Sequence, residues 1–239
     1  DMLRYHLEYS NYILSSGSLP FVPHNQLALA TDAELLFSMI IIWLGSSYVK
    51  LAIYINLLFC IYAVSIYFES FTEGVKKHAI VFFIASPILF LASTIVKPDT
   101  IQLLYFVVSL LLINKLYQKF SITNLILIAI FLGEVVSLKW TGLLPVLSLT
   151  IYLVFLFLIK AENRKTLFSL IFAIGLAVVI IPLYWYIRNY FATGNPIWPL
   201  MNQLFVTNDN SLLYEVSSHG SSRSGQIEIW GVIGYFYYT

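Results

Sequence analysis

The sequence predicts an all-α protein whose helices cross a lipid bilayer. Of its 239 residues, 59% are hydrophobic and only 10% are charged, whereas soluble domains contain roughly 45–50% apolar and about 25% charged residues. Uncharged apolar runs recur along the chain, and most approach the roughly 20 residues that a helix needs to span a membrane. A polytopic transmembrane helix bundle is therefore the expected fold class.

The amino-terminal region predicts two helices at one membrane surface. In its first segment, the apolar positions among residues 3–14 fit one face of a helix that lies in the interface. The SSGSLP stretch then interrupts the helical pattern. A second helix is expected over residues 33–44, after Thr31 or Asp32 as N-cap, and it is too short to cross a bilayer. Both helices are expected to be juxtamembrane.

The rest of the chain predicts about six spans followed by a loop. The apolar runs are residues 51–68, 79–96, 100–114, 121–133, 140–159 and 166–187, the third and fourth being extended by flanking residues to about 117 and 138. Three regions result: an outer-face loop with juxtamembrane helices (1–46), a transmembrane bundle (47–190) and an outer-face loop (191–239). We expect further spans in a longer polypeptide.

The short connections between the predicted spans indicate the orientation, because Lys and Arg are retained on the cytoplasmic side. If residue 1 starts outside, the cytoplasmic connections contain seven cationic residues, namely Lys76, Lys77, Lys115, Lys119, Lys160, Arg164 and Lys165. The two outward connections contain only Lys97 and Lys139. The regions before the first span and after the last one are therefore expected on the extracytoplasmic side.

Two outward connections, KPD and LKWTG, hold charges at the hydrocarbon boundary, where a charge is costly unless it is paired or used. Pro98 suits the first turn of a helix that Asp99 opens, so a helix cap with a snorkelling Lys97 explains KPD without any function. Glu134 lies five residues before Lys139, so a structural ion pair is the corresponding alternative for LKWTG. The functional interpretation is an anion site at the outer boundary.

A third cation of the predicted outer face is Arg188. It follows the sixth predicted span in PLYWYIRNYFATGNPIWP, among Tyr and Trp residues that are typical of a membrane interface. An arginine in such an aromatic belt is common. Because Lys97, Lys139 and Arg188 share one predicted face, we interpret them together as a candidate anion-binding set.

Other sites find little support in the sequence. Cys60 is the single cysteine and cannot form an internal disulfide, and a net charge of +1 without a basic run gives no nucleic-acid footprint. His6, Glu34 and Asp99 are ligand types that divalent metals use, but their spacing defines no metal site. No cofactor is therefore predicted, and a divalent metal stays an open alternative.

Several stretches stand in a suggestive order: DMLRYHLEYSNYILSSGSLP, the ELLF of residues 34–37, KPDT, SLKWTGLL and RNYFATGNPIWPLMN. Together they resemble the GT-C superfamily of polytopic membrane glycosyltransferases, especially the branch of protein mannosyltransferases and aminoarabinose or galacturonic-acid transferases. The resemblance extends over nearly the whole chain. It implies a polyprenyl-phosphate sugar as donor, an acceptor that enters from the outer side, and a bacterial or archaeal plasma membrane.

The resemblance also implies roles for individual residues. Asp1 corresponds to the acidic residue of the first outer loop, which the family uses as catalytic base. Asp99 corresponds to the acidic residue of the second outer connection, which supports the acceptor or the base. Lys139 matches the lysine near the lipid phosphate, and Arg188 matches a basic residue beyond a later span.

Two further correspondences are looser. Glu34 opens the juxtamembrane helix, where some relatives bind a metal through a carboxylate, and His6 follows Asp1 closely, so Glu34 and His6 are candidate acceptor or metal contacts. The mannosyltransferases carry Asp-Glu where this chain has Asp1 and Met2, which favours the bacterial-type branch.

The implied reaction is chemically consistent with these groups. A departing lipid phosphate is a weak base and needs no protonation, so the two-carboxylate arrangement of glycoside hydrolysis is not required. A base within reach of the acceptor hydroxyl and fixed cations facing the phosphate oxygens suffice. We expect direct attack by a hydroxyl of a glycan, lipid or protein, with inversion at the anomeric carbon.

Two other functions stay open. Charged residues at helix ends and interrupted segments are also typical of transporters or flippases for lipid-linked or anionic substrates. Glu134, inside a predicted span, is the best support for this alternative, although most ionisable groups lie at the predicted outer surface. A third interpretation is a non-catalytic membrane scaffold that binds through residues 207–224, which are rich in Ser, Asn and Gly.

Overall fold

In the computed structural model, the regular secondary structure of the described residues consists of helices. These residues are 2–19, 21, 32–70, 72–86, 97–159, 164–198 and 205. The helices are α1 (Met2–Ser16), α2 (Asp32–Leu44), α3 (Ser47–Tyr67), α4 (Glu73–Ile84), α6 (Asp99–Gln118), α7 (Ile122–Leu138), α8 (Leu143–Ile159), α9 (Arg164–Ile180) and α10 (Leu183–Thr193), with short 3₁₀ turns η1 (Phe68–Ser70) and η2 (Trp140–Gly142). The predicted all-α class is therefore observed.

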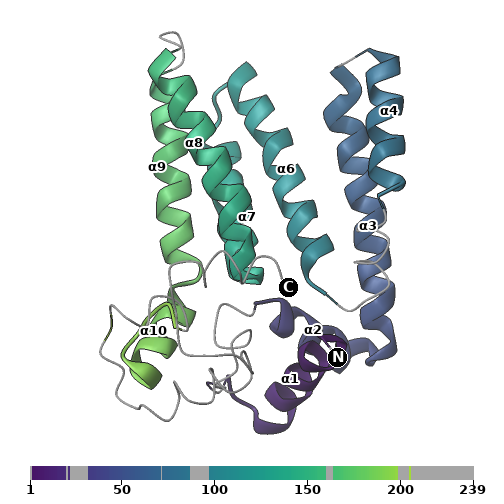
Figure 1. Cartoon of the computed structure of the whole chain (residues 1–239), viewed down its shortest axis with the longest axis vertical. Helices are drawn as coiled ribbons and strands as arrows, with labels where there is room; N and C mark the ends of the chain where they lie inside the picture. The colour runs from purple at the N-terminus through teal and green to yellow at the C-terminus, as the bar shows by residue number, and fades with distance from the viewer. Residues whose placement is uncertain are drawn as a thin grey trace, which may run out of the picture.

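The helices form a lengthwise bundle with a group of shorter helices at one end. Helices α3, α4, α6, α7, α8 and α9 run along the long axis, whereas α1, α2 and α10 lie together at the lower end in Figure 1. Helices α6 and α8 start at this end and α7 and α9 finish there, so the turn between α6 and α7 lies at the other end. We refer to the end that carries α1, α2 and α10 as the outer end, after the side of the membrane that the sequence predicts for it.

Several helices are long and apolar enough to cross a membrane. Among the described residues, three meet this condition: α3, α6 and the continuous helical stretch formed by η2 and α8. A fourth is added if α9 and α10 count as one bent span, and α7 is a shorter apolar helix. The structure thus supports a membrane protein, while the prediction of six spans stays a prediction, because residues 87–96 of the second predicted span lie outside the described residues.

The sixth predicted span is not a continuous helix. The sequence analysis expected one run over residues 166–187 that ends just before Arg188. Instead, α9 ends at Ile180, α10 begins at Leu183, and the two helices are bent by 41°. Pro182 lies at the break and explains it, because proline lacks the backbone N–H and clashes with the preceding helical turn. Arg188 is consequently in the middle of α10 and not at the end of a span.

Local chemistry sets other helix ends where the sequence predicted them. The expected juxtamembrane helix is α2, and it ends before Gly45, whose φ of 97° favours glycine. Helix α6 begins at Asp99, directly after Pro98, whose φ of −73° fits the start of a helix. The helix predicted over residues 3–14 is observed as α1.

Helix α7 lies at the centre of the apolar core. It packs against α6, α8 and α9 in one cluster, whose buried members are Ile113, Leu116, Leu125, Ile128, Leu132, Val135, Val136, Val146, Leu153, Leu167, Leu170 and Ile174. A second cluster at the outer end joins α2 to α3, α6 and α7 through Ala33, Phe37, Val49, Ile53, Ile101 and Leu138. Packing on several sides therefore fixes the outer end of α7.

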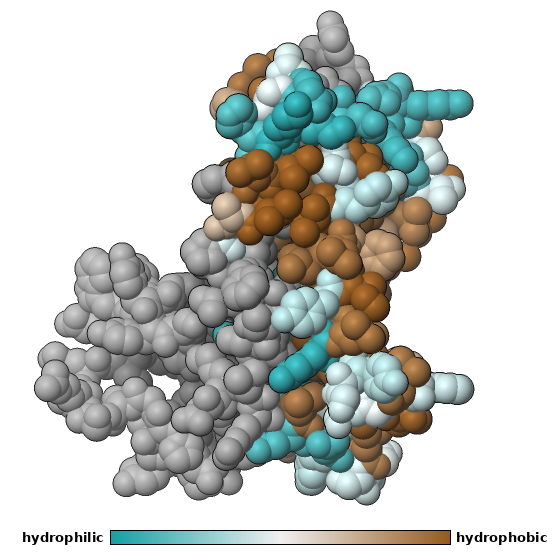
Figure 2. Space-filling view, turned by 90° about the vertical axis from the view of Figure 1, so that its right-hand side faces the viewer, coloured by the Kyte–Doolittle hydropathy of each residue, from teal (hydrophilic) through white to brown (hydrophobic). Residues whose placement is uncertain are grey.

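The lengthwise helices expose apolar side chains to their surroundings. Large exposed ones include Leu58 on α3, Phe155 and Leu158 on α8, and Phe172 on α9. On the face shown in Figure 2, hydrophobic residues predominate between hydrophilic groups at the top and near the bottom. A hydrophobic middle with polar ends is the surface that a bilayer-embedded bundle presents.

The predicted orientation can be tested by cysteine labelling. We expect a membrane-impermeant maleimide to label Tyr190→Cys on α10 in intact cells, but to label Lys119→Cys, just after α6, only after the membrane is permeabilised. Both positions are exposed, and the single native cysteine, Cys60, is buried and can be replaced by alanine. Labelling of Lys119→Cys in intact cells together with protection of Tyr190→Cys would reverse the orientation.

Candidate functional site

An ion pair joins the two short connections that the sequence singled out. Lys139 Nζ donates a hydrogen bond of 3.0 Å to Asp99 Oδ1, although the residues are 40 positions apart. The Lys139 side chain is 27% exposed and that of Asp99 38% exposed, so the pair is accessible. The sequence suggested Glu134 as the alternative partner of Lys139, but in the structure Lys139 pairs with Asp99. Asp99 Oδ2 is buried, and among the described residues nothing donates to it.

The backbone that carries Lys139 is held by α6. Gln102 Nε2 donates to the carbonyl oxygens of Val135 at 2.6 Å and Lys139 at 2.9 Å. The Val135 carbonyl lies in the last turn of α7, where no helical N–H follows to bond it, and the Lys139 carbonyl also accepts from the Gly142 N–H at 2.9 Å. Gln102 lies three residues after Asp99, which places both on one face of the first turn of α6. One helical turn thus holds Lys139 by its side chain and by its backbone.

Gly142 permits this close approach. A Cβ at this position would lie 2.0 Å from the Val135 carbonyl oxygen and 2.4 Å from Gln102 Nε2. The turn η2 can therefore fold against α7 only if residue 142 has no side chain. These contacts explain why LKWTG ends in glycine, which the motif alone does not show.

Arg188 is held by groups from α1 and α10. Its Nη1 donates to the Tyr9 hydroxyl at 3.3 Å, and its Nε and Nη2 donate to Asn189 Oδ1 at 3.3 and 3.0 Å. The guanidinium carbon also lies 4.7 Å from the centre of the Trp185 ring and 5.6 Å from that of Phe21, which is cation–π geometry. Arg188 is thus a partly buried cation with a fixed position.

The segment after Arg188 closes α10 with a tight turn. Gly194 has a φ of 78° and its N–H bonds the Tyr190 carbonyl, which is a left-handed helix end. The buried side chains of Thr193 and Asn195 bond the backbone of this turn, and Trp198 is fully buried. The stretch ATGNPIW is therefore a structural element that fixes the end of α10.

A carboxylate that the sequence analysis considered only as a helix cap connects the elements that carry the cations. Asp32 Oδ1 accepts a hydrogen bond of 2.9 Å from Trp185 Nε1, and Asp32 Oδ2 accepts one from Ser137 Oγ. Burial raises the pKa of Asp32 above its usual value, and the two hydrogen bonds act in the opposite direction. Asp32 begins α2, so α2, α7 and α10 meet at one carboxylate.

His6 and Glu34 form a buried pair between α1 and α2. Their side chains are 4% and 3% exposed, and His6 Nδ1 is hydrogen-bonded to Glu34 Oε1. Ser10 and Ser38 add hydrogen bonds between the two helices. Burial raises the pKa of Glu34, while the hydrogen bond and charge of His6 lower it. This arrangement locks α1 onto α2.

Replacing Glu34 should destabilise the outer end. We expect Glu34→Leu to lower the free energy of unfolding by about 2–4 kcal/mol, because His6 loses its buried partner. Glu34→Gln can keep the hydrogen bond and should have a smaller effect. Because burial raises the pKa of Glu34, the folded protein binds this proton more tightly than the unfolded chain, and wild-type stability falls as pH rises from the ordinary Glu value through the raised one.

Thermal unfolding in detergent across that pH range measures both effects. Glu34→Gln should remove the part of this fall that Glu34 causes and leave that of Asp32, whose pKa is also raised, and Glu8→Gln, an exposed position on α1, serves as control. A Glu34→Gln variant that keeps the wild-type dependence on pH would contradict the assignment.

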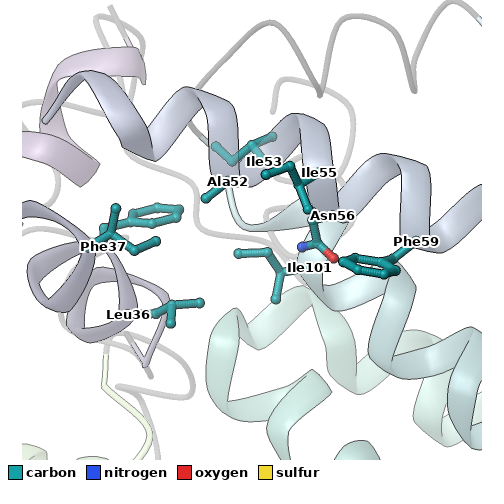
Figure 3. Close-up of a pocket in the computed structure, with 9 residues that line it drawn as sticks. Leu36, Phe37, Ala52, Ile53, Ile55, Asn56, Phe59 and Ile101 are labelled. Carbon is teal, nitrogen blue, oxygen red and sulfur yellow. The ribbon is translucent and has the colours of Figure 1, made fainter. Parts of the chain in front are cut away.

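An apolar pocket lies beside the first turn of α6. It has a volume of about 300 Å³ and is lined by Leu36, Phe37, Ile40, Ala52, Ile53, Ile55, Asn56, Phe59 and Ile101. Figure 3 shows these side chains coming from α2, α3 and α6, with Asn56 as the polar member. Ile101 is the one lining residue from α6; it follows Asp99 by two residues, so the two side chains point to different sides of the helix.

The structure brings together many of the predicted site residues. Asp99 contacts Lys139, His6 contacts Glu34, and all four lie on elements of the outer end, as does Arg188. Lys97 is a half-buried residue that precedes α6. Asp1, the predicted base, lies outside the described residues, as does most of the loop 191–239. In the described part of the chain, no group of three His, Cys, Asp or Glu side chains could hold a metal ion.

The sequence analysis missed Gln102 and the two partners of Asp32, Ser137 and Trp185. The only sequence signal for them is their position next to the motifs, since Ser137 precedes Lys139 by two residues and Trp185 precedes Arg188 by three. Comparisons of the chain with protein-family models, curated proteins and solved structures found no match.

Proposed function

We propose that this chain is part of a GT-C-type membrane glycosyltransferase, which transfers a sugar from a polyprenyl-phosphate donor to an acceptor hydroxyl at the outer membrane face. The observation that carries this proposal is the accessible Asp99–Lys139 pair at the end of the bundle where Arg188 also lies. A carboxylate and fixed cations at the edge of an apolar bundle suit a donor whose head is charged and whose tail is lipid.

Each group has a role in the proposed reaction. The Asp1 carboxylate takes the proton of the acceptor hydroxyl as that oxygen attacks the anomeric carbon. Lys139 and Arg188, with Lys97 nearby in sequence, stabilise the negative charge that grows on the leaving phosphate. Asp99 orients Lys139 and supports the acceptor. The bond between the anomeric carbon and the phosphate oxygen breaks as the acceptor oxygen attacks from the opposite face. One direct displacement of this kind inverts the configuration of the anomeric carbon.

The setting supports this assignment. We propose that the chain crosses the membrane six times, with the outer end on the extracytoplasmic side of a bacterial or archaeal plasma membrane. The pocket between α2, α3 and α6 is apolar, so it suits a part of the lipid tail. The acceptor is a hydroxyl of a glycan, lipid or protein, and neither a nucleic acid nor a resident cofactor is required.

A transporter or flippase for a lipid-linked or anionic substrate is the second candidate. The break between α9 and α10 favours it, because interrupted spans line substrate pathways in transporters. Glu134 on α7 is a further observation in its favour, since an acidic residue within an apolar helix often has a function. The gathering of the other charges at one end favours the transferase.

The two candidates differ in what happens to the donor. The full-length polypeptide that carries this chain is reconstituted in sealed vesicles with a radiolabelled polyprenyl-phosphate sugar and native membrane extract as acceptor source. We expect release of polyprenyl phosphate and transfer of label to the extract, and we expect Asp1→Asn to abolish both. Movement of intact donor across the vesicle membrane without its cleavage would favour the transporter.

A further inference from the structure

We propose that Asp32 is a positioning residue that sets the placement of Arg188 relative to Lys139. The inference rests on the proposed function, since it assigns Asp32 to the phosphate-binding groups of that same site. No catalytic contact by Asp32 itself is involved. Its carboxylate acts through Ser137 and Trp185, one on each of the two elements that carry the cations.

The first link runs from Asp32 to Lys139. Ser137 Oγ donates to Asp32 Oδ2 from the last turn of α7, where Ser137 is fully buried. Lys139 follows two residues later, and Gln102 fixes its carbonyl. A hydrogen bond at Ser137 therefore holds the outer end of α7 against the start of α2.

The second link runs from Asp32 to Arg188. Trp185 is 2% exposed, and its Nε1 donates to Asp32 Oδ1 at 2.9 Å. Arg188 lies three residues further along α10, on the same helical face, and its guanidinium covers the Trp185 ring at 4.7 Å. The indole is thus held at its nitrogen by Asp32 while its face supports the cation.

A carboxylate is well suited to this bridge. Ser137 and Trp185 are 105 and 153 residues away from Asp32 in sequence, and each arrives as a donor that needs an acceptor. The two oxygens of one carboxylate satisfy both at once. Because Asp32 Oδ1 and Oδ2 are both engaged by structural donors, the group is occupied in bonding and is not offered as a base.

The amide of asparagine distinguishes positioning from a role of the charge. In Asp32→Asn, the amide oxygen can still accept from Trp185, and its NH₂ can donate to the Ser137 hydroxyl, which then rotates to accept. Positioning therefore predicts that Asp32→Asn keeps both links without the charge, whereas Asp32→Ala loses both.

The test measures the separation of the two elements directly. Spin labels at Leu144→Cys, near the start of α8, and Tyr190→Cys on α10 are introduced in the Cys60→Ala protein, where both label positions are exposed. We expect a narrow distance distribution with Asp32 and with Asp32→Asn, and a shifted or broadened one with Asp32→Ala. Glu8→Ala, an exposed carboxylate on α1, is the matched control and should change nothing.

Turnover is measured on the same variants. Misplaced groups of a site can cost about 10²-fold in rate, so we expect a fall of that order in kcat for Asp32→Ala and a value near wild type for Asp32→Asn. An Asp32→Ala protein with an unchanged distance distribution overturns the inference. The inference is also overturned if Asp32→Asn keeps native distances but is as inactive as Asp32→Ala. The negative charge of Asp32 would then be needed for activity.

Two smaller changes keep the test decisive if Asp32→Ala does not fold. Trp185→Phe keeps a ring beneath Arg188 but removes the N–H, and Ser137→Ala removes the hydroxyl. Each should broaden the measured distances, and adding Asp32→Asn to the double variant should have no further effect. If the wild-type protein transfers no sugar, the proposed function fails, and the distance measurements still decide whether Asp32 sets the separation.

Discussion

Replacing Lys139 by alanine should lower the kcat of sugar transfer by about 10²–10³-fold while leaving the protein folded. The proposed reaction builds negative charge on the departing phosphate, and the Lys139 ammonium is a partly exposed cation bonded to Asp99. A partly exposed ion pair contributes only about 0–1 kcal/mol to stability. The measurement is steady-state release of polyprenyl phosphate, with thermal unfolding of the same preparation to show that folding is retained.

A charge exchange separates catalysis from structure in this pair. The double variant Asp99→Lys with Lys139→Asp can restore an ion pair between α6 and the end of α7, but it moves the cation to α6. We expect it to be as stable as the wild type and to show the low turnover of Lys139→Ala. Lys119→Ala, an exposed lysine at the opposite end of α6, should behave as wild type. Full activity of Lys139→Ala, or full recovery of kcat by the exchanged pair, would contradict the phosphate-binding role of Lys139.

Replacing Gly142 by alanine should cause the largest loss of stability among single-methyl changes in this site. The new Cβ would lie 2.0 Å from the Val135 carbonyl oxygen, a backbone atom inside the packed end of α7. Relieving that clash must separate η2 from α7 and break the hydrogen bonds of Gln102. We expect a loss of about 2–3 kcal/mol, in the range of overpacked cores, measured by thermal unfolding in detergent.

The same variant should also lose activity, because Lys139 lies three residues before Gly142. Gly175→Ala on α9 is the matched control, since apart from its own helical backbone and chain neighbours no atom lies within 4 Å of a Cβ built there. Alanine has a higher helix propensity than glycine, so that control should be neutral or slightly stabilising. Equal stability of the two variants would show that η2 is not packed against α7 as described.

Several features of the candidate site follow from the sequence, and others depend on helix geometry. The ion pair is an instructive case, because sequence distance suggested Glu134 as the alternative partner of Lys139. Residues five apart on a helix point in different directions, and Lys139 lies just beyond the end of α7 with an extended backbone. Its side chain is directed toward the start of α6, whose first residue is Asp99. The break at Pro182 was readable from the sequence but was not used there.

The sequence by itself determined that the chain is helical and apolar enough for a membrane, and it located the helix ends at Gly45 and Pro98. These properties depend on composition and on local backbone chemistry, which neighbouring residues control. Only the tertiary structure decided that Asp32 meets Ser137 and Trp185, that Gln102 holds the end of α7, and that Gly142 must lack a side chain. Those contacts join segments far apart in the chain, and their geometry depends on how whole helices pack, for which no local pattern carries a signal.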